Sequence, residues 1–388
     1  MPGPLATLTV IELAGIGPGP FACMMLADMG ARVIRVDRPP SRGAGAIETL
    51  MANDGFVDRG RQSIAVDLKH SKAIPAVLRL VERADILVEG YRPGVAERIG
   101  LGPDICLARN PRLVYGRITG WGQNGPWAKT AGHDINYIAL SGALHPMGYR
   151  DRPPSPPLNL VGDYGGGGMY LAAGLLAAHV ASKTTGRGQV VDAAMTDGAA
   201  LLMAPLYGLM AKGHWGDRRG ANFLDGAAHF YRVYECADGK FISVGAIEPR
   251  FYQLLLEGCG ISDPDFADQW RSECWAALGE KLASVFLTKT RDEWCVLFET
   301  SDACVAPVLS MSEAPEHPHN AARGTFVKSG GFSQPAPGPR FSETPAPMPE
   351  PAPETGRHTR LVLEELGYAA EEIEDLVGAG GAFAAPDS

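Results

Sequence analysis

The sequence predicts an α/β protein of two domains, with a mostly parallel sheet in the first domain and a smaller α/β domain after it. Its 388 residues exceed the size at which one hydrophobic core usually stops growing. Short apolar runs alternate with helical stretches through the first half, an order typical of a parallel sheet with helices on its faces. The hydrophobic fraction of 45% is enough for cores of this size.

The first β-loop-α-β unit sets this pattern. Residues 8–13 predict a strand, residues 21–29 a helix ended by Gly30, and residues 31–36 a second strand. The Gly/Pro loop between the first strand and the helix superficially resembles a dinucleotide fingerprint. That fingerprint requires its third glycine at position 20, where Pro20 stands. We therefore interpret the loop as a tight strand-to-helix turn and not as a nicotinamide or flavin site.

The rest of the large domain continues the alternation. Further strands are expected at residues 63–67, 84–89, 113–118 and 189–193. Between them, after Asp163 and its glycines, residues 169–182 predict an almost wholly apolar helix that must be buried against a core or a second subunit. A second apolar helix is expected at residues 197–210.

The smaller domain begins near Asp225. Residues 230–235 and 241–246, joined by an Asp238-Gly239 turn, predict a hairpin, and helices follow to about residue 310. The expected layout is a large domain at 1–200, a linker at 201–224, a small domain at 225–330 and a return segment at 331–388.

The return segment has three expected parts, with its helices packing on the large domain. Prolines recur through residues 334–354, which predicts an extended linker. Two short helices are expected at 359–366 and 370–377. The glycine- and alanine-rich residues 378–388 are expected to be frayed.

Composition excludes several function classes. A formal net charge of −9 argues against a general nucleic-acid-binding surface. No uncharged apolar run reaches membrane-spanning length. The seven cysteines show no CxxC pair, and their odd number does not suggest a disulfide framework. We expect a soluble protein with buried free thiols in a reducing compartment, the cytoplasm.

Three side chains carry candidate acid/base chemistry: His133, Asp163 and Glu248. An imidazole and a carboxyl group that face one carbon from opposite sides could remove a proton from one face and return one to the other, which is racemase chemistry. Local sequence leaves alternatives open. His133 could be a structural hydrogen-bonding residue, Asp163 a helix cap, and Glu248 an exposed turn carboxylate.

A locally basic stretch lies within this acidic protein, beginning with Arg32, Arg35 and Arg38. Such charges usually form a solvated face. Arg38 differs because it lies at the carboxyl end of a strand, where open α/β sheets bind ligands. A guanidinium there suits a nucleotide phosphate.

Five stretches, in this order, resemble the α-methylacyl-CoA racemases of the family III CoA-transferase (CaiB/BaiF) superfamily. The likeness runs from the first strand to about Gly324, and the stretches that carry it are residues 31–39, 132–137, 157–163, 245–249 and 301–308. The resemblance implies a large Rossmann-like domain and a smaller α/β domain joined by long linkers, in an interlocked homodimer. Residues 41–60 depart from the family pattern, which leaves their role at the adenine and phosphate end of CoA open.

The resemblance also implies roles for individual residues. His133 and Asp163 are implied as the two catalytic acid/bases, with Glu248 orienting the histidine, and Asn159 as a hydrogen-bond partner of Asp163. The positions implied to contact CoA are Arg38, Val66, Asp67, Leu68, Lys69, Gly132, His133, Asp134, Ile135, Asn136 and Tyr137.

These roles imply epimerisation of (2R)- and (2S)-2-methylacyl-CoA thioesters through an enolate. Asp163 then needs a raised pKa to hold a proton near neutral pH, and amides at the start of a helix at Gly165 are candidates for binding the enolate oxygen. No metal or redox cofactor is expected, because CoA is part of the substrate. Apolar side chains that could line an acyl surface, or be ordinary core, are Met195, Leu202, Met203 and Leu206.

Two other functions remain possible at this point. A family III CoA-transferase would use Asp163 as a nucleophile that carries the acyl group as an anhydride, and would need no second base. A catalytically inactive CoA- or partner-binding protein would need neither. Retention of His133 and Glu248 beside Asp163 favours the racemase over both.

Overall fold

In the computed structural model the described residues are 3–40, 56–329, 331–345, 347–348 and 350–386. The chain forms two compact units. The larger comprises Met1–Ser141, Leu158–Leu202 and Phe326–Ser388, and the smaller comprises Gly142–Pro157 and Met203–Thr325. Residues 142–157 therefore group with the smaller unit, although the sequence suggested that they belong to the large domain. The expected linker at 201–224 lies mostly in the smaller unit as well.

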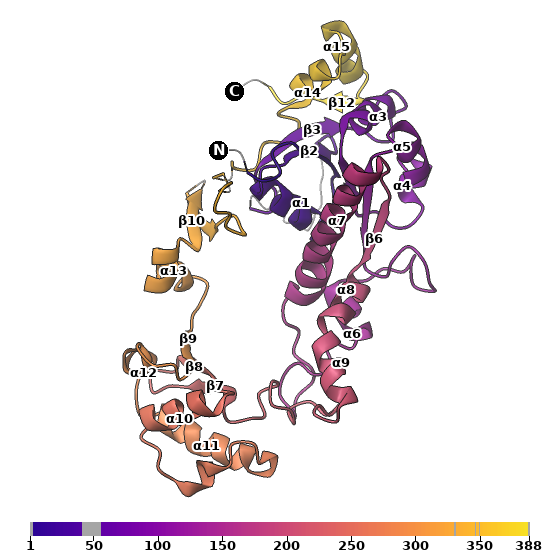
Figure 1. Cartoon of the computed structure of the whole chain (residues 1–388). Coiled ribbons are helices and arrows are strands. Elements are labelled where there is room, and N and C mark those ends of the chain that lie inside the picture. The colour runs from indigo at the N-terminus through magenta and orange to yellow at the C-terminus, as the bar shows by residue number, and fades with distance from the viewer. Residues whose placement is uncertain (1–2, 41–55, 330, 346, 349, 387–388) are drawn as a thin grey trace. The chain divides into compact units, whose positions relative to one another are not determined.

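A seven-stranded sheet of order β12-β3-β2-β1-β4-β5-β6 forms the centre of the larger unit (Figure 1). Six of its strands are parallel, as the alternating pattern predicts. They are β1 (Thr9–Leu13), β2 (Arg32–Asp37), β3 (Arg61–Val66), β4 (Ile86–Glu89), β5 (Val114–Thr119) and β6 (Val190–Ala194). The expected α/β fold with a Rossmann-like sheet is confirmed.

Helices cover both faces of this sheet, because consecutive strand residues point to opposite sides. Val10 of β1 packs in one core with α1 (Pro18–Asp28) and α7 (Tyr170–Thr185). Its neighbour Ile11 packs in the other core with residues of four further helices. These are α3 (Ile74–Arg83), α5 (Pro103–Arg109), α14 (Thr359–Glu365) and α15 (Ala370–Gly378). The short helix α4 (Val95–Arg98) precedes α5.

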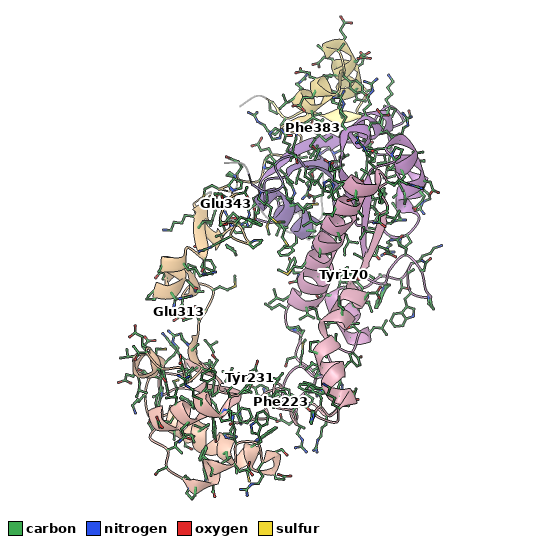
Figure 2. All side chains as sticks on the ribbon, in the orientation of Figure 1. Tyr170, Phe223, Tyr231, Glu313, Glu343 and Phe383 are labelled. Carbon is green, nitrogen blue, oxygen red and sulfur yellow. The ribbon has the colours of Figure 1, made fainter. Side chains whose placement is uncertain are left out.

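Part of the C-terminal segment belongs to the sheet, so the expectation of a frayed end was wrong for residues 382–383, while residues 387–388 lie outside the described residues. After α15 the chain forms β12 (Ala382–Phe383), which pairs antiparallel with β3. Phe383, labelled in Figure 2, accepts a hydrogen bond through its carbonyl from the Thr359 hydroxyl at 2.7 Å. Pairing with β3 satisfies backbone N–H and C=O groups of this segment. The glycine-rich composition alone did not predict this pairing.

The proline-rich return segment runs extended along the larger unit. It begins with the hairpin of β10 (Phe326–Ser329) and β11 (Phe332–Pro335). Arg59, which is paired with Asp28 of α1, donates hydrogen bonds to the Gln334 side chain at 2.8 Å and to the Pro335 carbonyl at 2.9 Å. No helix forms among the described residues between 336 and 353, as the prolines predict.

The single helix expected at 197–210 is two helices, α8 (Met195–Leu202) and α9 (Ala204–Ala211). Pro205 explains the break, because its ring crowds the carbonyl of the preceding turn and it has no N–H to donate. The apolar helix α7 buries one face, but its other face exposes Tyr170, labelled in Figure 2, and Val180 at 66%.

The smaller unit is α/β with an antiparallel sheet. The predicted hairpin is present as β7 (Tyr231–Glu235) and β8 (Phe241–Gly245), and β9 (Val305–Val308) extends the sheet. Its core is formed by the sheet together with α10 (Pro249–Gly258), α11 (Trp275–Phe286) and α12 (Arg291–Phe298). The short α13 (Pro318–Arg323) follows. None of the helices in the described part of the chain has the length and apolar character needed to cross a membrane.

Candidate active site

The strand order 3-2-1-4-5-6 places a topological switch point between β1 and β4, because the chain moves outward in one direction from β1 and later returns to its other side. Open parallel sheets bind ligands at the carboxyl ends of the strands beside such a point. The segments that leave those ends carry Gly17 after β1, Arg38 after β2, Arg92 after β4 and Trp121 after β5. Most of the sequence-predicted residues of the larger unit follow these strands.

His133 lies where the chain enters α6 (Asp134–Leu140). Its backbone is extended, as is usual for an N-cap residue, and its N–H donates to the Asn136 side-chain oxygen at 3.1 Å. The imidazole is exposed, and it makes no side-chain capping hydrogen bond to α6. The local backbone is thus fixed while the ring remains available to a substrate.

Aromatic packing fixes the start of α6. The Tyr137 ring lies edge-on to Trp121 with centroids 4.8 Å apart, and its hydroxyl donates to the Gly132 carbonyl. A Cβ at Gly120 would lie 2.0 Å from the Tyr137 ring, and one at Gly132 would lie 2.7 Å from it. Only glycine permits this packing, which sets the position of His133.

Asp163 is half-buried within a ten-residue π-helix, Leu160–Met169, that continues into α7. Its Oδ2 accepts a hydrogen bond from the Asn159 side chain at 3.2 Å, and its N–H donates to Asp134 Oδ1 at 2.7 Å. Burial, the largest influence, raises the pKa of the Asp163 carboxyl group, and so does the nearby Asp134 charge. The hydrogen bond from Asn159 and the His133 charge lower it. The net direction is upward, as the sequence-based mechanism requires.

The two predicted acid/base groups lie near each other, because the residue after His133, Asp134, accepts the Asp163 N–H at 2.7 Å. They come from different elements, the entry to α6 and the π-helix. Gly17 lies beside the Asp163 carboxyl group, since a Cβ at position 17 would lie 3.5 Å from Asp163 Oδ2. Gly17 also has a left-handed backbone, with φ of 72°, which favours glycine.

The glycines after Asp163 serve close packing. A Cβ at Gly166 would lie 2.5 Å from the Ala199 nitrogen of α8, and one at Gly168 would lie 2.7 Å from the Phe21 ring of α1. Binding of an enolate by amides of the Gly165 segment stays a prediction. The π-helix makes it less favourable, because internal N–H groups of such a helix bond to the carbonyl five residues earlier. Asp163 is not a side-chain cap.

The predicted CoA-contacting residues lie at one edge of the sheet. Arg38 is exposed beyond β2, and its charge acts on the half-buried phenol of Tyr91 after β4. Val66 ends β3, and Lys69 is exposed in the turn that follows, where its N–H donates to Asp67 Oδ1 at 2.9 Å. β2 and β3 are paired in parallel, so their carboxyl ends share this edge. Residues 41–55 of the divergent loop fall outside the described residues.

Arg92 was missed from the sequence. It is exposed after β4, on the far side of the switch point from Arg38, and its charge acts on the Tyr137 phenol. It therefore brings a second guanidinium toward the segment that carries His133. Its position just after the carboxyl end of β4 was a signal that could have identified it.

Glu248 lies in the smaller unit as the N-cap residue of α10, between β8 and the helix. Its charge acts on the thiol of Cys304, so two of the family-like stretches, 245–249 and 301–308, meet in this unit. The pairing of Glu248 with His133 stays a prediction.

The candidate acyl-surface residues divide between core and surface. Met195 is core, with 7% exposure, and its Cγ would lie 3.0 Å from a Cβ added at Gly167, which favours the core alternative over a binding role. Leu202 is 51% exposed. Met203 and Leu206 line a cavity of about 370 Å³ in the smaller unit, together with Tyr207, Met210 and Trp215.

Comparison with known proteins adds three findings. The model of CoA-transferase family III matches residues 5–359. The chain is similar to alpha-methylacyl-CoA racemase of Mus musculus, with 45% identity, and to that of Homo sapiens, with 44% identity, each over 96% of both chains. A solved CAIB/BAIF family protein from Brucella suis superposes with a TM-score of 0.81 at 27% identity, covering 94% of this chain and 100% of that one.

Proposed function

The chain belongs to CoA-transferase family III, and from this premise we propose that it is an α-methylacyl-CoA racemase, an isomerase that interconverts (2R)- and (2S)-2-methylacyl-CoA thioesters. The observation that carries the proposal is the hydrogen bond from the Asp163 N–H to Asp134 Oδ1 at 2.7 Å, because it holds Asp163 beside the chain neighbour of His133. Two acid/base groups at one site are what transfer of a proton between the faces of a carbon requires.

The proposed reaction passes through an enolate. The thioester carbonyl accepts charge when the α-proton leaves, which makes that proton acidic. Neutral His133 removes the proton from one epimer, and protonated Asp163 delivers a proton to the opposite face. The roles reverse for the other epimer. The raised pKa of Asp163 supports this assignment, because a carboxyl group must hold a proton near neutral pH to act as the acid.

Glu248 is proposed to orient the His133 imidazole. A carboxylate that accepts from one ring nitrogen fixes the tautomer and raises the basicity of the other. In support, the described residues of the larger unit supply no hydrogen-bond partner to this ring. Glu248 is presented at a helix N-terminus, after a strand of the smaller unit, where its backbone is fixed.

CoA is proposed to lie along the carboxyl edge of the sheet. Arg38 and Arg92 would bind its phosphates, because a guanidinium matches phosphate geometry with paired N–H donors. The turn from Val66 through Asp67, Leu68 and Lys69 and the segment from Gly132 to Tyr137 would contact the rest. The reaction is proposed to use no metal or redox cofactor, since it requires only a base, an acid and a thioester.

The acyl chain is proposed to contact apolar side chains near the start of the smaller unit, with Met203 and Leu206 at the cavity described above. The proposed chains are branched 2-methylacyl groups of the kind handled in fatty acid metabolism. Flexible methionine suits an apolar surface that accepts chains of differing shape.

A homodimer, interlocked as in the family, is also proposed. Its support is the exposure of apolar helices that a monomer would leave in water. α9 is almost wholly apolar yet has no buried residue, and α7 exposes Val180. We place the protein in the cytoplasm. Its seven cysteines, all in the described part of the chain, are unpaired, which suits a reducing compartment.

One experiment separates the candidate functions. The purified protein is incubated with a single 2-methylacyl-CoA epimer in deuterium oxide, and the α-carbon is followed by NMR. Deuterium incorporation with loss of chirality, without an added acceptor acid, supports the racemase. In a parallel incubation with an added free acid, transfer of CoA from the thioester to that acid without α-exchange would show a CoA-transferase that uses Asp163 as nucleophile. Binding without turnover would show an inactive binding protein.

A further inference from the structure

Asp134 is the residue that holds Asp163 in place. It is the first residue of α6 and is 6% exposed. Its Oδ1 accepts the backbone N–H of Asp163 at 2.7 Å, which links α6 to the π-helix. A Cβ at Gly162 would lie 2.3 Å from the same oxygen, so only glycine permits this approach.

The charge of Asp134 is unusual among the buried carboxylates of the described residues. Glu12, Asp28, Asp58 and Glu89 are buried and each is paired with an arginine. Asp134 is buried without an ion pair to any described residue, and its Oδ2 has no hydrogen-bond partner among them. An unpaired buried charge is costly, so buried charges in proteins are usually paired.

We propose that Asp134 is a positioning residue for the racemase reaction: it fixes the Asp163 backbone and keeps an unneutralised negative charge beside the Asp163 carboxyl group. The inference rests on the proposed function and extends it. The Asp134 side chain does not touch the reacting carbon in this account, and its proposed effect on the proton transfer is exerted through Asp163.

The consequence is electrostatic. A second negative charge nearby makes ionisation of Asp163 less favourable, which helps it retain a proton near neutral pH. Among the described residues the other groups that act on Asp163 are the His133 imidazole and the Asn159 amide, which both favour the carboxylate. The Tyr137 phenol also lies within electrostatic reach. In the β1–α1 loop, Gly17 lies beside Asp163 and carries no charge.

The test uses Asp134→Asn, which keeps an acceptor oxygen for the Asp163 N–H but removes the charge. The Asp163 carboxyl carbon is followed by NMR titration in aspartate-labelled, substrate-free protein, with Asp163→Asn used to assign the signal. We expect the pKa of Asp163 to fall by about one unit in the variant. An unchanged titration of Asp163 overturns the proposal.

The matched control is Asp104→Asn, which removes an exposed carboxylate of α5 in the same unit and is expected to leave the Asp163 titration unchanged. An equal fall in the control variant would show a general effect of net charge and overturn the proposal. If Asp134→Asn does not fold, Asp134→Ser supplies a second neutral acceptor for the same titration. Absence of α-proton exchange in the unmodified protein would instead refute the proposed function, and the Asp163 titration would still decide the role of Asp134.

Discussion

Asn159 donates a hydrogen bond from Nδ2 to Oδ2 of Asp163 over 3.2 Å. This bond stabilises the charged carboxylate, whereas burial and the neighbouring Asp134 charge favour the protonated form. Asp163 therefore lies between opposing influences, which suits a group that must both give and accept a proton. Asn159 precedes the π-helix and Asp134 begins α6, so two separate segments set the balance.

Replacing Asn159 by alanine should raise the pKa of Asp163, because a donor to the charged form is lost. Asp163 controls one limb of the plot of kcat/KM against pH. That limb should move to higher pH by about half to one unit. Asp134→Asn should move the same limb in the opposite direction. A shift of both variants in the same direction would contradict the account.

His133→Ala and Asp163→Ala should each abolish epimerisation. Loss of a positioned acid/base typically costs about 10²- to 10⁴-fold, and each group is needed on its own face of the carbon. Chirality of the product is followed by NMR, and circular dichroism checks that each variant is folded. Full activity in either variant would refute the assignment of two bases.

Gly166→Ala should destabilise the larger unit. A Cβ there would lie 2.5 Å from the Ala199 backbone nitrogen, so the π-helix and α8 would have to separate. We expect a loss of about 2–3 kcal/mol in the free energy of unfolding. The matched control is Gly378→Ala in α15, where an added Cβ meets no atom within 4 Å. Gly378→Ala should leave the free energy of unfolding unchanged or raise it slightly. Equal losses of this free energy in the two variants would contradict the packing role of Gly166.

His229 should make the smaller unit acid-sensitive. It is 0% exposed, and its Nε2 contacts the Tyr252 hydroxyl at 2.7 Å. That hydroxyl donates to the Phe266 carbonyl, so Nε2 carries the hydrogen and Nδ1 has no partner among the described residues. Burial lowers the pKa of His229 to about 4. Protonation would place an N–H on Nδ1 where nothing accepts it.

The unfolded chain takes up this proton near its ordinary pKa of about 6.5, and the folded chain only near pH 4. The contribution of His229 to the free energy of unfolding is therefore fully present above pH 6.5. It falls by about 3 kcal/mol as the pH decreases toward 4. His229→Gln keeps a donor to Tyr252 and should remove this part of the slope. Tryptophan fluorescence, which includes the buried Trp294, follows the unfolding. Parallel pH dependences in the two proteins would contradict the prediction.

Much of the fold follows from local pattern. The parallel strands were predictable because short apolar runs bounded by glycine and proline repeat along the first half, and the Asp238-Gly239 turn identified the hairpin. The strand Ala382–Phe383 was missed because its pairing with β3 depends on a strand more than 300 residues away and not on its own composition. The break between α8 and α9 could have been read from Pro205.

The site was partly visible in the sequence. Family likeness identified Asp163, and its neighbouring glycines suggested close packing, but not a π-helix, whose i to i+5 bonding leaves no clear local pattern. Arg92 and Gly17 reach the site only because the strand order brings the ends of β4 and β1 together. The buried, unpaired state of Asp134 depends on tertiary contacts that a single sequence does not contain.

The most direct test of the central claim, that His133 and Asp163 face one carbon from opposite sides, is exchange by single-base variants. Asp163→Asn and His133→Asn are each incubated separately with the (2R) and the (2S) epimer in deuterium oxide, and α-deuterium is measured by NMR. The account predicts that each variant exchanges one epimer only, with retained configuration, and that the two variants exchange opposite epimers. Exchange of both epimers by either variant, or of the same epimer by both, would contradict it.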